Sequence, residues 1–182
     1  MAAAARKLFA DRGYASTTIQ AIAEEAGYAV QTVYFHFGSK ATIVRYLFEQ
    51  MKAEDILPLY ERSMREADPL ERLAITARIA RQAGERWWDI YTLLRSAGRA
   101  DPELSGLYRQ LDDERLYGVR TLAQALADAG HLREGLDVQR ATDILWAIAA
   151  EDTYQRLVVE RDWSPDDYEA WLRRCLQQEL IG

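Results

Sequence analysis

The side chains best suited to contact bases and phosphates lie close together in the first quarter of the chain. The Gln31 amide can bond N6 and N7 of adenine together. Thr32 can contact a base or a phosphate, and Val30 or Phe35 can touch the methyl group of thymine. Gln20 can reach a base or the nucleic-acid backbone. The side chains expected on phosphates are Thr18, Tyr34, His36 and Lys40.

Two short helices joined by a glycine turn are predicted to position these groups. Thr18 is a candidate N-cap, and Gly27 can end the first helix in the left-handed conformation. The second helix is predicted over residues 29–36, and Ser39 can cap the helix that follows. The inner face of the first helix has apolar side chains at helical spacing, namely Ile19, Ile22, Ala23 and Ala26. This pattern predicts a helix-turn-helix, whose second helix enters the DNA major groove.

A structural interpretation stands beside the functional one at three of these positions. Thr18 can serve only as a cap, Tyr34 can serve only in amphipathic packing, and Val30 can belong to the core. The four consecutive aromatic residues from Tyr34 to Phe37 are more than a short helix with a purely structural role needs for packing. This excess favours contact with DNA.

The same stretch resembles the DNA-binding domain of the tetracycline-repressor (TetR) family. The resemblance covers residues 4–46 and is carried by Thr17, Thr18, Ile22, Ala23, Ala26, Gly27, Thr32, Tyr34, His36, Phe37, Ser39 and Lys40. Upstream, Leu8-Phe9-Ala10 and Arg12-Gly13-Tyr14 also fit the first helix of that family and its exit. The resemblance implies a homodimer that binds an operator, and a small-molecule inducer held inside the helical body.

Composition and charge fit a small DNA-binding head on an acidic body. The chain has 182 residues, 49% of them hydrophobic and 29% charged, with a net charge of −6. Residues 1–46 carry five Lys and Arg against three Asp and Glu, so this head is mildly basic. We therefore predict a helix-turn-helix domain over residues 1–46 and a ligand-binding and dimerisation domain over residues 47–182. No apolar run is long enough to span a bilayer, and the N-terminus is too short for a signal peptide, so a cytoplasmic protein without a membrane partner is expected.

The remaining sequence predicts an all-α fold of about nine helices, the first over residues 2–12. The helix that begins at Ser39 is expected to end or kink at Pro58. Further helix starts are predicted at Asp68-Pro69, Asp101-Pro102, Asp137 and Ser164-Pro165. A break is expected near Gly84, and the helix from Asp137 is expected to run to about Val159.

Two groups of residues in the body are candidates for ligand binding and dimerisation. The pocket candidates are aromatic or cationic, since a small-molecule site needs an apolar lining with a few polar groups: Trp87, Trp88, Tyr91, Arg95, Tyr108, Tyr117 and Trp146. A core or interface role is an equal alternative for the adjacent tryptophans. The dimer candidates lie in apolar stripes on the last two helices: Leu145, Ala149, Tyr168, Trp171, Leu172, Cys175 and Leu176.

Other classes of function lack support in the sequence. The acidic groups at 112–114 and 151–152 fan out along helices, so a solvated face is expected there rather than a metal site. No nucleophile–base pair or phosphate-binding glycine loop occurs, and neither an enzyme activity nor a cofactor is predicted. The prediction is a repressor released from a near-palindromic operator by a small molecule. The alternative is a helical ligand-binding or interaction protein whose head no longer binds DNA.

Overall fold

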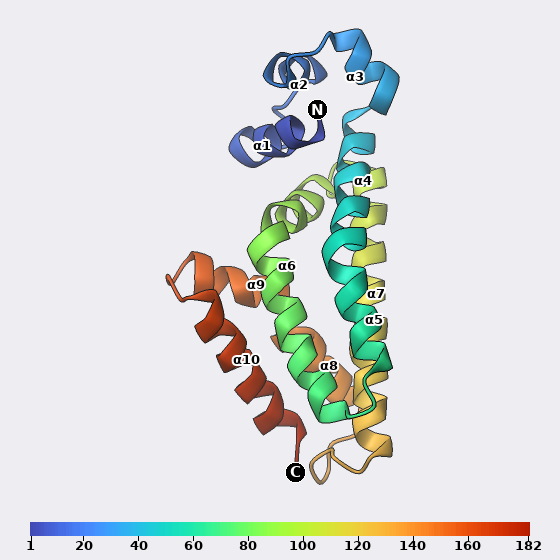
Figure 1. Cartoon of the computed structure of the whole chain (residues 1–182), viewed down its shortest axis with the longest axis vertical. Helices are drawn as coiled ribbons and strands as arrows, with labels where there is room; N and C mark the ends of the chain where they lie inside the picture. Colours follow the sequence, from blue (N-terminus) through green and yellow to red (C-terminus); the bar gives the residue numbers. More distant parts are fainter. The chain divides into compact units, whose positions relative to one another are not determined.

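The computed structural model describes residues 1–182 apart from the side chain of Asp55, and this part of the chain is helical. Its α-helices, traced in Figure 1, are α1 (Ala2–Arg12), α2 (Ile19–Ala26), α3 (Val30–Phe37), α4 (Lys40–Met51), α5 (Leu57–Arg65), α6 (Pro69–Ala97), α7 (Pro102–Asp128), α8 (Val138–Ile148), α9 (Glu151–Tyr154) and α10 (Pro165–Leu180). Two π-helical turns are η1 (Lys52–Ile56) and η2 (Gln155–Val159). The predicted all-α class is confirmed. None of the helices described is both long and apolar enough to cross a membrane.

The chain packs into two compact units. Unit 1 comprises Met1–Ala53 and Asp89–Leu111. Within it, α2 packs on α3, and α1 packs on both α2 and α4. Its buried apolar side chains include Leu8, Phe9, Ile22, Val33, Ile43, Phe48, Met51, Ile90, Leu94 and Leu104. Helix α3 therefore belongs to a unit with a well-filled core.

Unit 2 comprises Glu54–Trp88 and Asp112–Gly182. Here α10 packs against α8 and η2. Its core cluster includes Leu73, Ala77, Leu122, Leu126, Ala141, Leu145, Tyr154, Tyr168, Leu172, Leu176 and Leu180. The two units are defined by contacts between residues and not by independent folding. The domain boundary predicted at residue 46 therefore stays a prediction.

The predicted helix starts are confirmed, because each proposed cap bonds an orphan amide of the first turn. Backbone N–H groups donate to the cap oxygens of Ser39 (from Thr42, 3.1 Å), Asp68 (from Leu70, 2.9 Å), Asp101 (from Glu103, 3.0 Å), Asp137 (from Arg140, 2.8 Å) and Ser164 (from Asp167, 3.0 Å). The interruption expected near Pro58 is also present. There α4 ends at Met51, η1 follows, and Pro58 lies in the first turn of α5, where its missing N–H costs nothing.

The break expected at Gly84 is wrong, because α6 runs through it without interruption. Gly84 serves packing instead. A Cβ at this position would lie 2.6 Å from both Cδ atoms of the Tyr154 ring and closer still to its Cγ. Glycine is therefore required by the neighbouring ring and not by the backbone conformation.

The long helix expected from Asp137 to Val159 is also wrong. The α-helix ends at Ile148, and Ala150 has an extended conformation (φ −74°, ψ 150°) before α9 begins. Neither a proline nor a glycine stands at this break. The break accompanies the burial of Tyr154, whose ring packs edge-on against Tyr168 at 5.0 Å between centroids. Tertiary packing thus overrides a locally good helical sequence.

Candidate nucleic-acid interface

The turn between α2 and α3 is held by local hydrogen bonds. The Thr18 side chain accepts from the Ala21 backbone N–H at 3.1 Å and starts α2. Gly27 has φ 71° and ψ 30°, the left-handed conformation that only glycine adopts without a Cβ penalty. The next backbone N–H, of Tyr28, donates to Ala23 O at 2.9 Å. Together these contacts satisfy both ends of α2 and set the direction in which α3 leaves.

One face of α3 is buried and the opposite face is open. Val33 is fully buried, whereas Phe35 is 86% exposed and Tyr34 is 53% exposed. Gln31 and His36 are exposed as well. An aromatic side chain this open on a short helix contributes nothing to the core, so its apolar surface is available to a partner. The face suits a major groove, because it combines an amide, aromatic rings and a hydroxyl.

The other predicted contact residues are distributed around this face. Val30 and Thr32 are half-buried at the start of α3. Gln20 is exposed on α2 and donates to the Glu24 carboxylate at 2.9 Å. Sequence reasoning passed over Tyr28, which stands exposed in the turn just before α3. An aromatic residue directly after the turn glycine is the signal that could have identified it.

Lys40, a predicted phosphate contact, already has a partner within the chain. Its Nζ donates to the Tyr14 carbonyl at 2.7 Å and lies 4.4 Å from the centroid of the Tyr14 ring. Partial burial lowers the pKa of Lys40, and the Asp101 carboxylate opposes this shift. One of the three N–H donors of Lys40 is therefore already used within the chain, and the other two remain for a phosphate.

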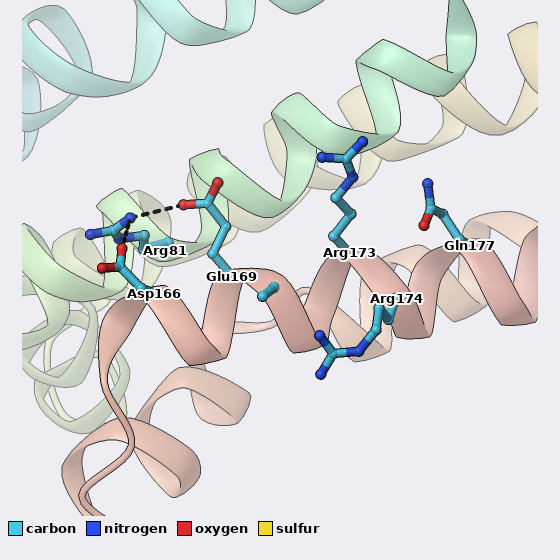
Figure 2. Close-up of a pocket in the computed structure, with 7 residues that line it drawn as sticks. Arg81, Asp166, Glu169, Arg173, Arg174 and Gln177 are labelled. Carbon is cyan, nitrogen blue, oxygen red and sulfur yellow. Dashed lines mark hydrogen bonds and ion pairs between the residues drawn. The ribbon is translucent and has the colours of Figure 1, made fainter.

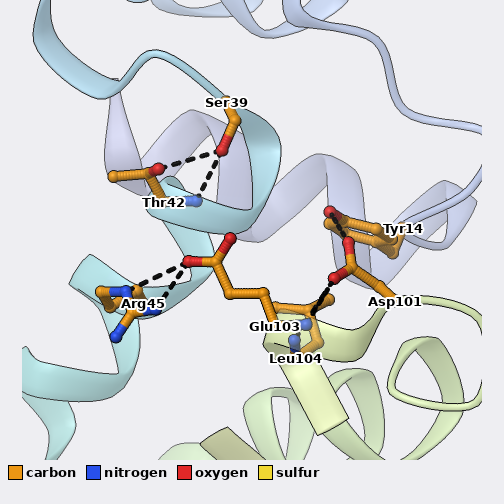
Figure 3. A network of polar contacts seen from close by, with 7 residues as sticks. All are labelled: Tyr14, Ser39, Thr42, Arg45, Asp101, Glu103 and Leu104. Carbon is orange, nitrogen blue, oxygen red and sulfur yellow. Dashed lines mark hydrogen bonds and ion pairs between the residues drawn. The ribbon is translucent and has the colours of Figure 1, made fainter. Parts of the chain in front are cut away.

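Polar contacts tie the elements flanking the helix-turn-helix to the second segment of unit 1. Arg6 binds Asp89 through two hydrogen bonds of 2.6 and 2.7 Å. Figure 3 shows the other contacts, in which Tyr14 Oη donates to Asp101 at 3.0 Å and Arg45 pairs with Glu103 at 2.7 Å. Asp101 accepts at the same time from the first turn of α7. Burial raises the pKa of the Tyr14 hydroxyl, and the bond to Asp101 raises it further, so Tyr14 remains a donor at neutral pH.

Comparison with known proteins identifies the family. Residues 2–47 match the family described as "Bacterial regulatory proteins, tetR family". The "Probable HTH-type transcriptional regulator ArpR" of Pseudomonas putida is 30% identical over 159 residues, which cover 79% of this chain and 72% of that protein. The chain belongs to the TetR family. It is thus a DNA-binding transcriptional regulator and not an enzyme.

Further similarities extend along the chain. The "Fatty acid metabolism regulator protein" of Bacillus subtilis is 29% identical over 154 residues, covering 81% of this chain and 77% of that protein. The crystal structure of FadR from Bacillus subtilis in complex with stearoyl-CoA superposes with a TM-score of 0.77 at 22% identity, over 98% of this chain and 95% of that one. The latter likeness shows that the TetR-family fold includes the helical body.

The predicted pocket residues of this TetR-family chain fall into two groups. Trp87 and Tyr91 on α6 are buried, and Trp88, Arg95 and Tyr108 are half-buried, so they stay candidates for a lining. The other two have exposed side chains in unit 2. Tyr117 is 63% exposed, and Trp146 lies beneath Arg115, whose guanidinium carbon is 5.0 Å from the ring centroid.

Four of the dimer candidates need a correction because they are buried within the single chain. Leu145, Tyr168, Leu172 and Leu176 are fully buried within the core of their own unit, so they cannot meet a second chain. The apolar stripe of α10 is occupied by neighbours such as Tyr154 and the residues of α8. Ala149, Trp171 and Cys175 are half-buried and stay predictions.

Proposed function

We propose that this regulator is a repressor, which binds a near-palindromic DNA site as a homodimer and leaves it when a small molecule binds the helical body. The observation that carries the DNA contact is the open face of α3, with Gln31, Tyr34 and Phe35 exposed above a buried Val33. An isologous dimer presents two such faces, so half-sites one helical turn apart, ~34–36 Å, or a multiple of it are expected.

The proposed contacts divide into base and backbone contacts. Gln31 is the base reader, since its amide matches adenine, and Phe35 supplies apolar contact to a thymine methyl. Tyr34, His36 and Lys40 are the proposed phosphate contacts, and Lys40 keeps two N–H donors beyond the one given to the Tyr14 carbonyl. The contacts to phosphate set register and carry the salt dependence of binding. With few basic residues in the head, a shallow dependence of affinity on salt is expected.

The test compares DNA affinity in gel-shift assays on genomic fragments that the protein captures. Gln31→Ala and Tyr34→Ala should each weaken specific binding by roughly 5- to 150-fold, the range expected for about 1–3 kcal/mol per good contact. Gln178→Ala and Tyr117→Ala are matched controls on exposed positions of α10 and α7 and should bind like the parent. If the two α3 variants also bind like the parent, the contact assignment is wrong.

The relatives support a long-chain acyl thioester as the first ligand class to test. One relative is named a fatty acid metabolism regulator, and FadR of Bacillus subtilis was solved with stearoyl-CoA. Stearoyl-CoA should release the captured DNA, and coenzyme A alone should not. Because the two binding free energies are linked, saturating DNA must weaken acyl thioester binding by the same factor. Release by neither compound excludes this ligand class and leaves the DNA contacts unaffected.

A further inference from the structure

An arginine at the start of α6 is buried inside unit 2. Arg72 is 8% exposed, and an arginine side chain stays charged in proteins. Moving a charge out of water is costly unless a counter-charge or hydrogen bonds compensate for it. The position adds to this cost, because the positive end of the helix dipole lies at the start of α6. A buried cation at this place therefore calls for an anion.

The guanidinium group of Arg72 lacks a carboxylate partner among the described residues. Its Nη2 donates to Met64 Sδ at 3.7 Å, and a thioether sulfur is only a weak acceptor. Its Nε is buried without a hydrogen-bond partner in the same part of the chain. Two acids close in sequence are used elsewhere, because Asp68 caps α6 and Glu61 pairs with Arg65. The charge of Arg72 is thus left without compensation.

A second arginine of α6 in the same unit has the partners that Arg72 lacks. Figure 2 shows Arg81 between two acids of α10, with Nη1 2.7 Å from the Asp166 carboxylate and 3.1 Å from that of Glu169. Arg81 is also more exposed than Arg72. The more buried of the two arginines is therefore the one without a counter-charge.

Aromatic and flexible side chains lie beside Arg72. Burial and the neighbouring Tyr117 hydroxyl raise the pKa of Tyr60, and the nearby charge of Arg72 opposes this shift. Tyr60 packs on α7, where a Cβ at Gly118 would lie 3.0 Å from Tyr60 Cε2. Met64 and Tyr117 are both exposed. Since Met64 is flexible and touches both solvent and Arg72, a ligand can reach the guanidinium group by displacing it.

We propose that Arg72 binds the anionic group of the ligand that the helical body takes up, a carboxylate or a phosphate of a long-chain acyl compound, in place of Met64. Displacement of Met64 frees Nη2, and Nε and Nη2 together form one edge of the guanidinium group. Arg6 uses this edge to bind both oxygens of Asp89, at 2.6 and 2.7 Å. Such a two-point contact suits carboxylates and phosphates. The inference rests on the ligand response proposed above and adds the chemical group that Arg72 would recognise.

Binding of three ligands to the whole chain tests this role. They are stearate, stearoyl-CoA and the stearoyl thioester of N-acetylcysteamine, which carries no phosphate, each titrated calorimetrically below its micelle concentration. Arg72→Met keeps the length of the side chain and removes its charge and donors. It should weaken binding of the anionic ligand that the parent takes up by roughly 10- to 150-fold. A loss for stearate identifies a carboxylate site, and a loss for stearoyl-CoA identifies a phosphate site.

Two further measurements separate this role from a structural one. Arg72→Met should raise the urea midpoint of the ligand-free chain, because it removes a buried charge that lacks a partner, whereas the loss of a structural ion pair would lower the midpoint. Its affinity for the neutral thioester should equal that of the parent. Arg78→Met makes the same change at an exposed position of α6 and should leave the affinity for every ligand unchanged.

The outcomes distinguish this inference from the wider proposal. If the parent binds stearoyl-CoA and Arg72→Met binds it equally well, Arg72 is not the anion site, although the acyl thioester class stands. An equal loss for the neutral thioester, or a lower urea midpoint without ligand, would show that Arg72 serves packing. If the parent binds stearate but not stearoyl-CoA and Arg72→Met loses stearate, the thioester class fails and the anion site stands. If the parent binds neither anionic ligand, both fail.

Discussion

Gly84→Ala should destabilise unit 2 although alanine is the better helix former. The added Cβ would lie 2.6 Å from two ring atoms of Tyr154 and closer to a third, which sits next to the backbone-anchored Cβ and cannot swing aside. Overpacking of this kind costs about 1–3 kcal/mol, and here the upper part of that range applies. The gain in helix propensity offsets about 1 kcal/mol. The net loss in the free energy of unfolding should therefore be about 1–2 kcal/mol.

A second glycine of the same kind supplies the control. Gly106 lies within α7, and a Cβ there would meet no atom within 4 Å, so Gly106→Ala should stabilise by about 1 kcal/mol. Urea unfolding followed by circular dichroism measures both changes, and melting temperature should move by about 2–4 °C per kcal/mol. In a Tyr154→Ala background, Gly84→Ala should become stabilising. Equal stabilisation by both glycine substitutions in the parent chain would refute the packing argument.

Three further outcomes follow from local contacts. Thr18→Ala should lower stability by about 1 kcal/mol in urea unfolding, because the Ala21 N–H loses its cap, and Thr18→Ser should restore most of it. Tyr14→Phe should cost about 1 kcal/mol at pH 8, because the bond to Asp101 is lost. Because the pKa of Tyr14 is raised, the folded chain holds the hydroxyl proton more tightly than the unfolded chain does. The stability that this hydroxyl contributes is therefore fully present below pH 10 and falls as the pH rises. The difference in free energy of unfolding between the parent and Tyr14→Phe should accordingly be smaller at pH 10.5 than at pH 8. A double-mutant cycle on Arg6 and Asp89 should give a coupling of about 1 kcal/mol, and a coupling near zero would contradict a structural role for this partly exposed pair.

The contacts of Arg6, Tyr14 and Arg45 suggest where DNA affinity can be adjusted without touching α3. All three partners, Asp89, Asp101 and Glu103, lie in the second segment of unit 1. Tyr14 also holds the Lys40 ammonium group through its carbonyl and ring. The position of Lys40 therefore depends on Tyr14, and Tyr14 is held by a residue 87 positions later in the chain.

The sequence alone determined the features that depend on a few adjacent residues. Thr18, Gly27 and Ser39 delimit the helix-turn-helix because a cap or a left-handed turn is decided within four residues. The starts at Asp101-Pro102 and Ser164-Pro165 follow from the same local chemistry. The TetR resemblance rests on this stretch, which explains why it could be identified before any tertiary contact was known.

Tertiary structure alone decided which apolar stripes are used inside the chain. Helical spacing places Leu172 and Leu176 on one apolar face of α10. The same sequence pattern results whether this face is buried in the core of its own chain, as it is here, or against a second copy. Gly84 is required by the Tyr154 ring, which is remote from it in sequence. The break at Ala150 accompanies the burial of the same ring, which depends on the packing of the whole unit. Lys40 likewise contacts the carbonyl and the ring of Tyr14, which lies 26 positions earlier in the chain. Local propensity is worth at most about 1 kcal/mol per residue, whereas burying an aromatic side chain is worth several, so the packing of such side chains has the final decision.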